Sequence, residues 1–214
     1  MDFIDKDLVK YIESHTEEAP ELLSMLDRET YANIYMPRML SGHLQGRILA
    51  MLSNMIQPKV ILEIGTYTGY SAISLAEGLA ENGKIITIDI NEELEELVRN
   101  YIAKANLENI IDYRVGNAID VIPTIEDELD LVFIDADKGN YSNYFDLVFG
   151  KLKRGGFIIA DNVLWSGKVL EKNRKKIDKD TSAILSFNKK VHDDVRVENV
   201  LFPIRDGLMV LRKK

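Results

Sequence analysis

The chain has 214 residues, 46% of them hydrophobic and 29% charged, and its formal net charge at pH 7 is −8. A chain of this length fits one large domain with a sizeable buried core. The sequence contains no cysteine, which excludes disulfides, zinc thiolates and thiol nucleophiles, and its acidic balance argues against a general polyanion binder.

The first 15 residues, MDFIDKDLVKYIESH, are amphipathic and acidic and lack the basic and apolar regions of a signal peptide. No apolar run approaches the roughly 18 residues that span a bilayer. We therefore expect a cytoplasmic protein without a membrane partner.

The N-terminal quarter of the chain has the hydrophobic spacing of helices. A first helix places Leu8, Tyr11 and Ile12 on one face, and two more helices are predicted over 21–35 and 44–56. We expect these helices to precede the main fold.

From residue 59 the pattern changes to an alternation of strands and helices. Strands are predicted at 60–65, 84–90, 110–116, 130–135 and 156–160, and helices at 69–81, 92–105, 118–122 and 140–150. This order is typical of βαβ units and a parallel sheet. A helix at 181–191 and two strands at 195–202 and 208–214, joined by the turn PIRDG, add an antiparallel hairpin. We expect one domain over 1–214, with N-terminal helices at 1–56 and an α/β core at 57–214.

The first strand runs into a glycine loop, EIGTYTGYS, that opens a helix. Gly65 and Gly69 let the backbone turn sharply and approach a ligand. The spacing differs from the G-x-G-x-x-G of dinucleotide folds, and Glu63 would repel a pyrophosphate but suits a positively charged cofactor such as an amino-acid sulfonium. Asp89, at the end of the second strand, stands where acids bind ribose hydroxyls. The alternative is that both acids only cap helices or face a loop.

Two further apolar strands end abruptly in oxygen-bearing side chains, Asp135 after the first and Asp161-Asn162 after the second. Ligands of open parallel sheets lie outside the carboxyl ends of the strands. Three such oxygens predict a Mg²⁺ site with positions left for a vicinal diol or catechol. The alternative is a simple turn and a helix cap. Lys138 is predicted to be a general base or a partner of the substrate oxygen, with a surface ion pair as the alternative.

Four segments, EIGTYTGYSA, DADKGNY, DNVLWSG and PIRDG, together resemble the cation-dependent, S-adenosylmethionine-dependent O-methyltransferases, the group of caffeoyl-CoA and catechol O-methyltransferases and their bacterial relatives. The resemblance covers residues 35–213. It implies the class I methyltransferase (Rossmann-like) fold, a three-layer α/β sandwich with a seven-stranded mixed sheet, the last strand antiparallel, and an N-terminal helical extension. It also implies S-adenosylmethionine and a divalent cation, Mg²⁺ first, with Mn²⁺ or Ca²⁺ as alternatives.

The resemblance further implies a role for each matching residue. The methionine part of the cofactor would be lined by Met39, Ser41, Glu63, Gly65, Tyr67 and Ser71. Asp89 would hold the ribose, Asn117 and Ala118 would edge the adenine, and Asp137 would lie near the cofactor. Asp135, Asp161 and Asn162 would bind the metal, and Asp135 would also border the cofactor and take part in catalysis with Lys138. Lys138 would lie beside the substrate hydroxyl, and Trp165 would form part of the acceptor wall.

The acceptor implied by the resemblance is a small vicinal-dihydroxy aromatic, a catechol or caffeoyl-CoA-like molecule. The segment 166–181 is basic, with Lys168, Lys172, Arg174, Lys175, Lys176 and Lys179. It is either a solvated loop or a patch for a phosphate-bearing acceptor. Such an acceptor could be a CoA thioester or a tRNA, and a tRNA 5-hydroxyuridine O-methyltransferase is therefore the alternative function.

Other classes fit the sequence less well. An NAD-dependent oxidoreductase is disfavoured by the missing G-x-G-x-x-G, and a serine hydrolase by the missing G-x-S-x-G. The three histidines, His15, His43 and His192, form no metal or triad spacing, and we expect His43 to be structural or to face solvent. A homodimer through the N-terminal helices is usual in the resembled family and is expected here.

Overall fold

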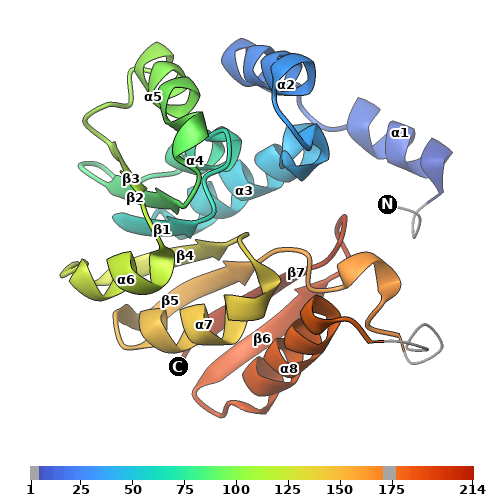
Figure 1. Cartoon of the computed structure of the whole chain (residues 1–214), viewed down its shortest axis with the longest axis vertical. Coiled ribbons are helices and arrows are strands. Elements are labelled where there is room, and N and C mark those ends of the chain that lie inside the picture. The colour runs from blue at the N-terminus through green and yellow to red at the C-terminus, as the bar shows by residue number, and fades with distance from the viewer. Residues whose placement is uncertain (1–4, 171–176) are drawn as a thin grey trace. The chain divides into compact units, whose positions relative to one another are not determined.

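The computed structural model describes residues 5–170 and 177–214, and within it the chain divides into two units, residues 5–117 and residues 118–214. Figure 1 labels the α-helices and strands of both units. The predicted organisation as one domain, with helices over 1–56 and an α/β core over 57–214, stays a prediction.

Three helices open the first unit: α1 (Lys6–Ser14), α2 (Glu21–Asn33) and α3 (Gly42–Ile56). The carboxylate of Asp5 caps α1 by accepting hydrogen bonds from the N–H groups of Asp7 and Leu8. A short 3-10 turn, η1 (Pro37–Met39), separates α2 from α3. The predicted helical region is therefore confirmed.

An alternation of strands and helices follows: β1 (Val60–Ile64), α4 (Tyr70–Ala76), β2 (Lys84–Asp89), η2 (Glu92–Leu94), α5 (Glu95–Lys104) and β3 (Ile111–Val115). The three strands are parallel and lie in the order β3-β2-β1, as predicted. β1 and β2 are mostly apolar and almost wholly buried, which is typical of parallel strands. In this register Glu63 lies opposite Thr87 and Asp89 lies opposite Val115.

Helix α4 ends at Ala76, whereas the sequence predicted a helix as far as residue 81. Gly78 lies directly against the backbone of Ser53 and Asn54 in α3, and this close approach turns the chain out of the helix. The N–H of Ala80 then bonds the carbonyl of Pro58 at 3.0 Å, next to the start of β1. Packing against α3 thus overrides the helical preference of the segment.

The second unit contains α6 (Ala118–Val121), η3 (Ile122–Thr124), β4 (Leu129–Ile134), η4 (Lys138–Asn140), α7 (Tyr141–Phe149), β5 (Leu152–Ala160), η5 (Trp165–Gly167), α8 (Lys179–Asp193), β6 (Val197–Phe202) and β7 (Leu208–Lys213). Its strands lie in the order β4-β5-β7-β6; β4 and β5 are parallel, and β7 is antiparallel to β5 and β6. Helices α7 and α8 lie side by side against these strands (Figure 1). Both units together supply the seven strands of the predicted mixed sheet, and its last strand is antiparallel as predicted.

Strand β5 begins at Leu152, earlier than the predicted start at residue 156. Leu129 pairs with Leu152 but Leu131 pairs with Phe157, so β5 holds extra residues in a β-bulge. The bulge includes Gly155, whose φ of +80° suits glycine. Gly155, which precedes the predicted start of the strand at residue 156, therefore lies inside the strand.

Each unit has its own apolar core. Leu62, Leu75 and Ile86 are fully buried in the first unit, and Phe133 and Phe187 are fully buried in the second. Because these cores hold the strands rigidly, the residues at the strand ends have defined positions.

Candidate active site

The glycine loop between β1 and α4 turns through three residues of positive φ: Gly65 at 101°, Tyr67 at 50° and Gly69 at 90°. Glycine adopts such values readily, which explains two of the three positions. The N–H of Gly65 bonds the carbonyl of Ile88 at 2.9 Å. The loop is therefore held tightly at the ends of β1 and β2.

Glu63 lies at the base of this loop and is fully buried. Thr87, opposite it in β2, donates a hydrogen bond to its carboxyl oxygen Oε2. The hydroxyl of Thr66 lies 2.6 Å from that of Thr87 and extends this hydrogen-bond network. Thr66 and Thr87 are supporting residues that the sequence did not single out, although the strand register places Thr87 opposite the acid.

Asp89 connects the end of β2 to the glycine loop. Its Oδ2 accepts a hydrogen bond from the N–H of Tyr67 at 2.6 Å, and its Oδ1 accepts one from the N–H of Asn91 at 2.9 Å. A carboxylate has about four lone-pair sites, so each oxygen keeps capacity for another donor. Asp89 is therefore oriented by the backbone and still able to bind hydroxyl groups.

The loop before α3 lies against the glycine loop through Tyr67. The phenol of Tyr67 donates to the carbonyl of Tyr35 at 3.2 Å or of Met36 at 3.3 Å. Met36 has a φ of 60° and leads into η1, whose last residue, Met39, is exposed; Ser41 follows before α3. The structure thus connects the loop of Met39 and Ser41 to the glycine loop.

The remaining residues predicted to bind the cofactor differ in exposure. Ser71 is buried in the first turn of α4. The N–H of Gly116 bonds the carbonyl of Asp89 at 2.8 Å. This bond holds the backbone just before Asn117 next to Asp89, and Asn117 itself is exposed. Ala118 is buried and begins α6 in the second unit.

In the second unit, Asp135 and Asp161 directly follow the paired ends of β4 and β5. Ile134 pairs with Ala160, and the N–H of Asp161 bonds the carbonyl of Ile134 at 2.9 Å. Asp161 is buried, and the side chain of Asp135 is 20% exposed. Asn162 adopts a φ of 58° and donates its N–H to the Asp161 carboxylate at 2.7 Å. Residues 5–170 and 177–214 hold no group of three His, Cys, Asp or Glu side chains placed to bind a metal, so the predicted set depends on the carboxamide of Asn162.

Lys138 is buried beside these acids. Its Nζ lies 3.1 Å from Asp135 Oδ1 and 2.6 Å from the Tyr141 hydroxyl, and 5.9 Å from the centre of the Trp165 ring. Burial raises the pKa of Tyr141 well above its ordinary value, and the charges of Asp135 and Asp161 raise it further. Tyr141 therefore stays a neutral phenol next to the lysine, a contact that the sequence did not predict.

Asp137 is bonded within its own turn. Its carboxylate accepts hydrogen bonds from the Tyr144 hydroxyl and from Nδ2 of Asn140, the latter at 2.7 Å. These contacts fix the start of α7, and the predicted place of Asp137 near the cofactor stays a prediction.

Trp165 lies in a loop held by the hairpin turn between β6 and β7. Trp165 and Ser166 both have positive φ, 48° and 51°. The buried carboxylate of Asp206 accepts a hydrogen bond from the N–H of Ser166 at 2.7 Å. The backbone carbonyl of Asp206 accepts one from the N–H of Leu164 at 2.8 Å. Burial raises the pKa of Asp206, and the charge of Lys138 opposes this shift. Asp206 is a further supporting residue, which the sequence named only as part of a turn.

The basic segment is described only at its two ends. Lys168 pairs with Asp178 at 2.9 Å, and its Nζ lies 5.6 Å from the centre of the Trp165 ring. Lys179 opens α8. The other basic residues of the segment, Lys172, Arg174, Lys175 and Lys176, lie outside the described residues.

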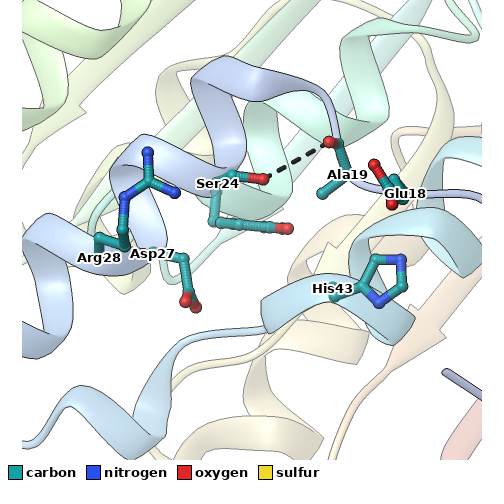
Figure 2. Close-up of a pocket in the computed structure, with 7 residues that line it drawn as sticks. Glu18, Ala19, Ser24, Asp27, Arg28 and His43 are labelled. Atoms are coloured by element: carbon teal, nitrogen blue, oxygen red, sulfur yellow. Dashed lines mark hydrogen bonds between the residues drawn. The ribbon is translucent and has the colours of Figure 1, made fainter. Parts of the chain in front are cut away.

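A pocket of about 330 Å³ lies in the first unit and is lined by Glu18, Ala19, Ser24, Asp27, Arg28, His43 and Tyr70 (Figure 2). His43 Nε2 lies 2.6 Å from the carbonyl of Glu17, a contact that fits the structural role expected for His43. The lining contains none of the residues predicted for the cofactor or metal.

Within the described chain, every helix is too short or too polar to span a membrane.

A family model described as O-methyltransferase matches residues 13–214. The caffeoyl-CoA O-methyltransferase of Medicago sativa is 38% identical over 179 residues, which cover 79% of this chain and 72% of that protein. Caffeoyl-CoA O-methyltransferase 1 of Arabidopsis thaliana is also 38% identical over 179 residues, covering 79% of this chain and 69% of that protein.

Two solved structures extend the likeness to almost the whole chain. The O-methyltransferase from Bacillus cereus in complex with SAH has a TM-score of 0.89 and 28% identity, and the match covers 97% of each chain. The SAH-bound Podospora anserina methyltransferase PaMTH1 has a TM-score of 0.88 and 25% identity, covering 99% of this chain and 97% of that one.

The fold is therefore that of the class I methyltransferases, as predicted. Within that class the chain belongs to the O-methyltransferase family. The predicted enzyme class, an S-adenosylmethionine-dependent O-methyltransferase, is confirmed, and the oxidoreductase alternative is set aside.

Proposed function

We propose that the chain transfers the methyl group of S-adenosylmethionine to one hydroxyl of a small vicinal-dihydroxy aromatic, a catechol or caffeoyl-CoA-like acceptor, in a reaction that needs a divalent cation. The main support is the contact between Lys138 and Asp135 at the end of β4, beside the end of β5 that leads to Asp161 and Asn162. An amine that can accept a proton, next to oxygen atoms that can bind a cation, suits the deprotonation of a hydroxyl held near that cation.

The first unit supplies most of the proposed methyl-donor site. Asp89 would hold the ribose hydroxyls, since its two oxygens are oriented by backbone N–H groups and keep acceptor capacity. The methionine part would be lined by Met39, Ser41, Glu63, Gly65, Tyr67 and Ser71. The adenine would be edged by Asn117 and Ala118, with Asp135 and Asp137 also near the cofactor.

Asp135, Asp161 and Asn162 would hold the cation, Mg²⁺ first, with Mn²⁺ or Ca²⁺ as alternatives. Their chemistry fits, because hard cations prefer oxygen donors and three protein ligands leave positions for water and acceptor oxygens. The burial of Asp161 beside Asp135 also fits, because buried carboxylates need positive charge nearby. When bound, a cation there would favour ionisation of an acceptor hydroxyl.

Two protein residues would then have separate roles in the reaction. Lys138 would accept the proton of the acceptor hydroxyl. A bond forms between that oxygen and the methyl carbon while the carbon–sulfur bond of the donor breaks, leaving S-adenosylhomocysteine. Trp165 would form part of the wall of the acceptor site. Much of the rate gain would come from holding the oxygen, the methyl carbon and the sulfur in line.

The names of the relatives support a phenolic acceptor, since the Medicago sativa and Arabidopsis thaliana proteins are caffeoyl-CoA O-methyltransferases. The test is an assay of the purified protein with labelled S-adenosylmethionine and Mg²⁺ against catechol, caffeoyl-CoA and undermodified tRNA. We expect label in the catechol or caffeoyl-CoA product. Label only in tRNA, with a strong salt dependence, would instead establish the tRNA 5-hydroxyuridine alternative.

A homodimer through the N-terminal helices is part of the proposal. Tyr31, Tyr35 and Met39 are exposed in this region and would be covered by a second copy. Light scattering at micromolar concentration should give twice the 24.4 kDa mass of the chain. The mass of one chain would contradict the dimer.

A further inference from the structure

One buried phenol joins the ends of β4 and β5. Tyr141, the first residue of α7, is fully buried. Its hydroxyl lies 2.6 Å from Lys138 Nζ, 3.0 Å from the carbonyl of Asp161 and 3.3 Å from the carbonyl of Ile134. A single oxygen therefore contacts the proposed base and the backbone of both strands that lead to the proposed cation ligands.

The direction of these hydrogen bonds follows from the groups involved. The N–H groups of Lys138 donate to the Tyr141 oxygen at 2.6 Å, and both the charged and the neutral amine have hydrogens for this bond. The phenol has one hydrogen, and the nearer carbonyl, that of Asp161, receives it. The phenol oxygen therefore accepts from Lys138 and donates to the backbone at the same time.

The ring of Tyr141 is also held in place. It packs edge-on against Phe187 of α8, with ring centres 5.4 Å apart and an interplanar angle of 85°. A lysine side chain has four flexible bonds and loses much rotamer freedom when it is fixed. The buried Tyr141 hydroxyl, 2.6 Å from Lys138 Nζ, therefore restricts the amine more than the longer, partly exposed contact with Asp135 at 3.1 Å does.

We infer that Tyr141 is a positioning residue for the methyl transfer, whose hydroxyl holds the amine of Lys138 beside Asp135. This inference rests on the proposed role of Lys138 as the group that accepts the hydroxyl proton. Tyr141 itself is too deeply buried to touch the acceptor, and it acts only through Lys138.

The test is the Tyr141→Phe variant, which keeps the ring and removes the hydroxyl. We expect kcat with the catechol acceptor to fall about 10- to 100-fold, the effect of losing one hydrogen bond to a charged group. The KM for S-adenosylmethionine should not change. The Mn²⁺ affinity, measured by the electron paramagnetic resonance of free Mn²⁺, should also not change, because the side chains of Asp135, Asp161 and Asn162 remain.

The matched control is Tyr101→Phe in α5. Tyr101 is equally buried and donates its hydroxyl to Glu29 at 2.6 Å, so the same atom is lost from a bond of similar kind. We expect this variant to keep wild-type kcat. Equal losses of kcat in both variants would show a general effect of destabilisation and would overturn the inference.

A double variant separates failure of the inference from failure of the proposed function. If Tyr141 acts through Lys138, Tyr141→Phe causes no further loss of kcat when it is added to Lys138→Met. Wild-type kcat in Tyr141→Phe, with Lys138→Met inactive, would overturn the inference alone. Wild-type kcat in Lys138→Met would overturn the proposed function together with the inference. A weaker Mn²⁺ affinity in Tyr141→Phe would also overturn the inference, because it would show that the hydroxyl acts on the cation ligands instead.

Discussion

At the scale of single residues, Glu63 shows how the interior accommodates an acid next to the cofactor loop. Its carboxyl group is fully buried in β1, and Thr87 donates a hydrogen bond to it from β2. A buried carboxyl group without hydrogen bonds is costly. The two threonine hydroxyls at positions 66 and 87 therefore belong to the site as much as the acid does.

We predict that Thr87→Val destabilises the protein by about 1–3 kcal/mol, because it removes a donor from a buried carboxyl group while keeping the shape of the side chain. The free energy of unfolding in urea measures this loss. Thr30→Val is the matched control: Thr30 is equally buried, but its hydroxyl lies 3.4 Å from that of Thr68, a weak bond. Equal losses in the two variants would contradict the importance of the Thr87 bond.

The acids at the strand ends could be predicted from the sequence, because each follows a short apolar run and strand ends share one sheet edge. Their supporting partners could not. Thr87, Tyr141 and Asp206 reach Glu63, Lys138 and Ser166 through pairings or turns that close only when the chain folds. Tyr141 and Asp206 stood inside the recognised motifs, yet nothing in the spacing indicated their contacts.

At the scale of elements, the close approach of α3 and α4 depends on glycine. A Cβ at Gly78 would overlap backbone atoms of Ser53 and Asn54, and one at Gly46 would press on the Tyr70 ring. Backbone cannot move aside as a flexible side chain can. The pair of helices therefore tolerates no larger residue at position 78.

We predict that Gly78→Ala destabilises the protein by about 3 kcal/mol or more, at the upper end of overpacking effects, because the α3 backbone itself must shift. Gly150→Ala is the control, since Gly150 has a φ of −67° and no neighbouring atom within 4 Å of an added Cβ. That variant should be neutral or more stable by up to about 1 kcal/mol. Urea unfolding of both variants tests the pair, and a stable Gly78→Ala protein would show that α3 and α4 are further apart.

The order of the elements was predictable, because the change from helical to alternating periodicity marks it clearly. Two boundaries were not. Helix α4 ends early because Gly78 meets α3, and β5 starts early because a bulge carries it through Gly155. Both depend on contacts between segments that the local sequence does not encode.

At the scale of the whole molecule, the chemistry is divided between two units. The first holds Glu63, Tyr67 and Asp89 around the glycine loop, which suit the methyl donor. The second holds Asp135, Lys138 and the end of β5, which suit a cation and an ionising hydroxyl. We expect the cation ligands that follow β5, Asp161 and Asn162, to be needed for turnover and not for binding the donor.

The measurement that tests this claim most directly compares turnover and donor binding with and without the cation. We predict that excess EDTA, and separately Asp161→Ala, abolishes methyl transfer to the catechol acceptor, while calorimetry still detects binding of S-adenosylmethionine, because the proposed donor residues of the first unit are untouched. Full turnover in excess EDTA would contradict the account.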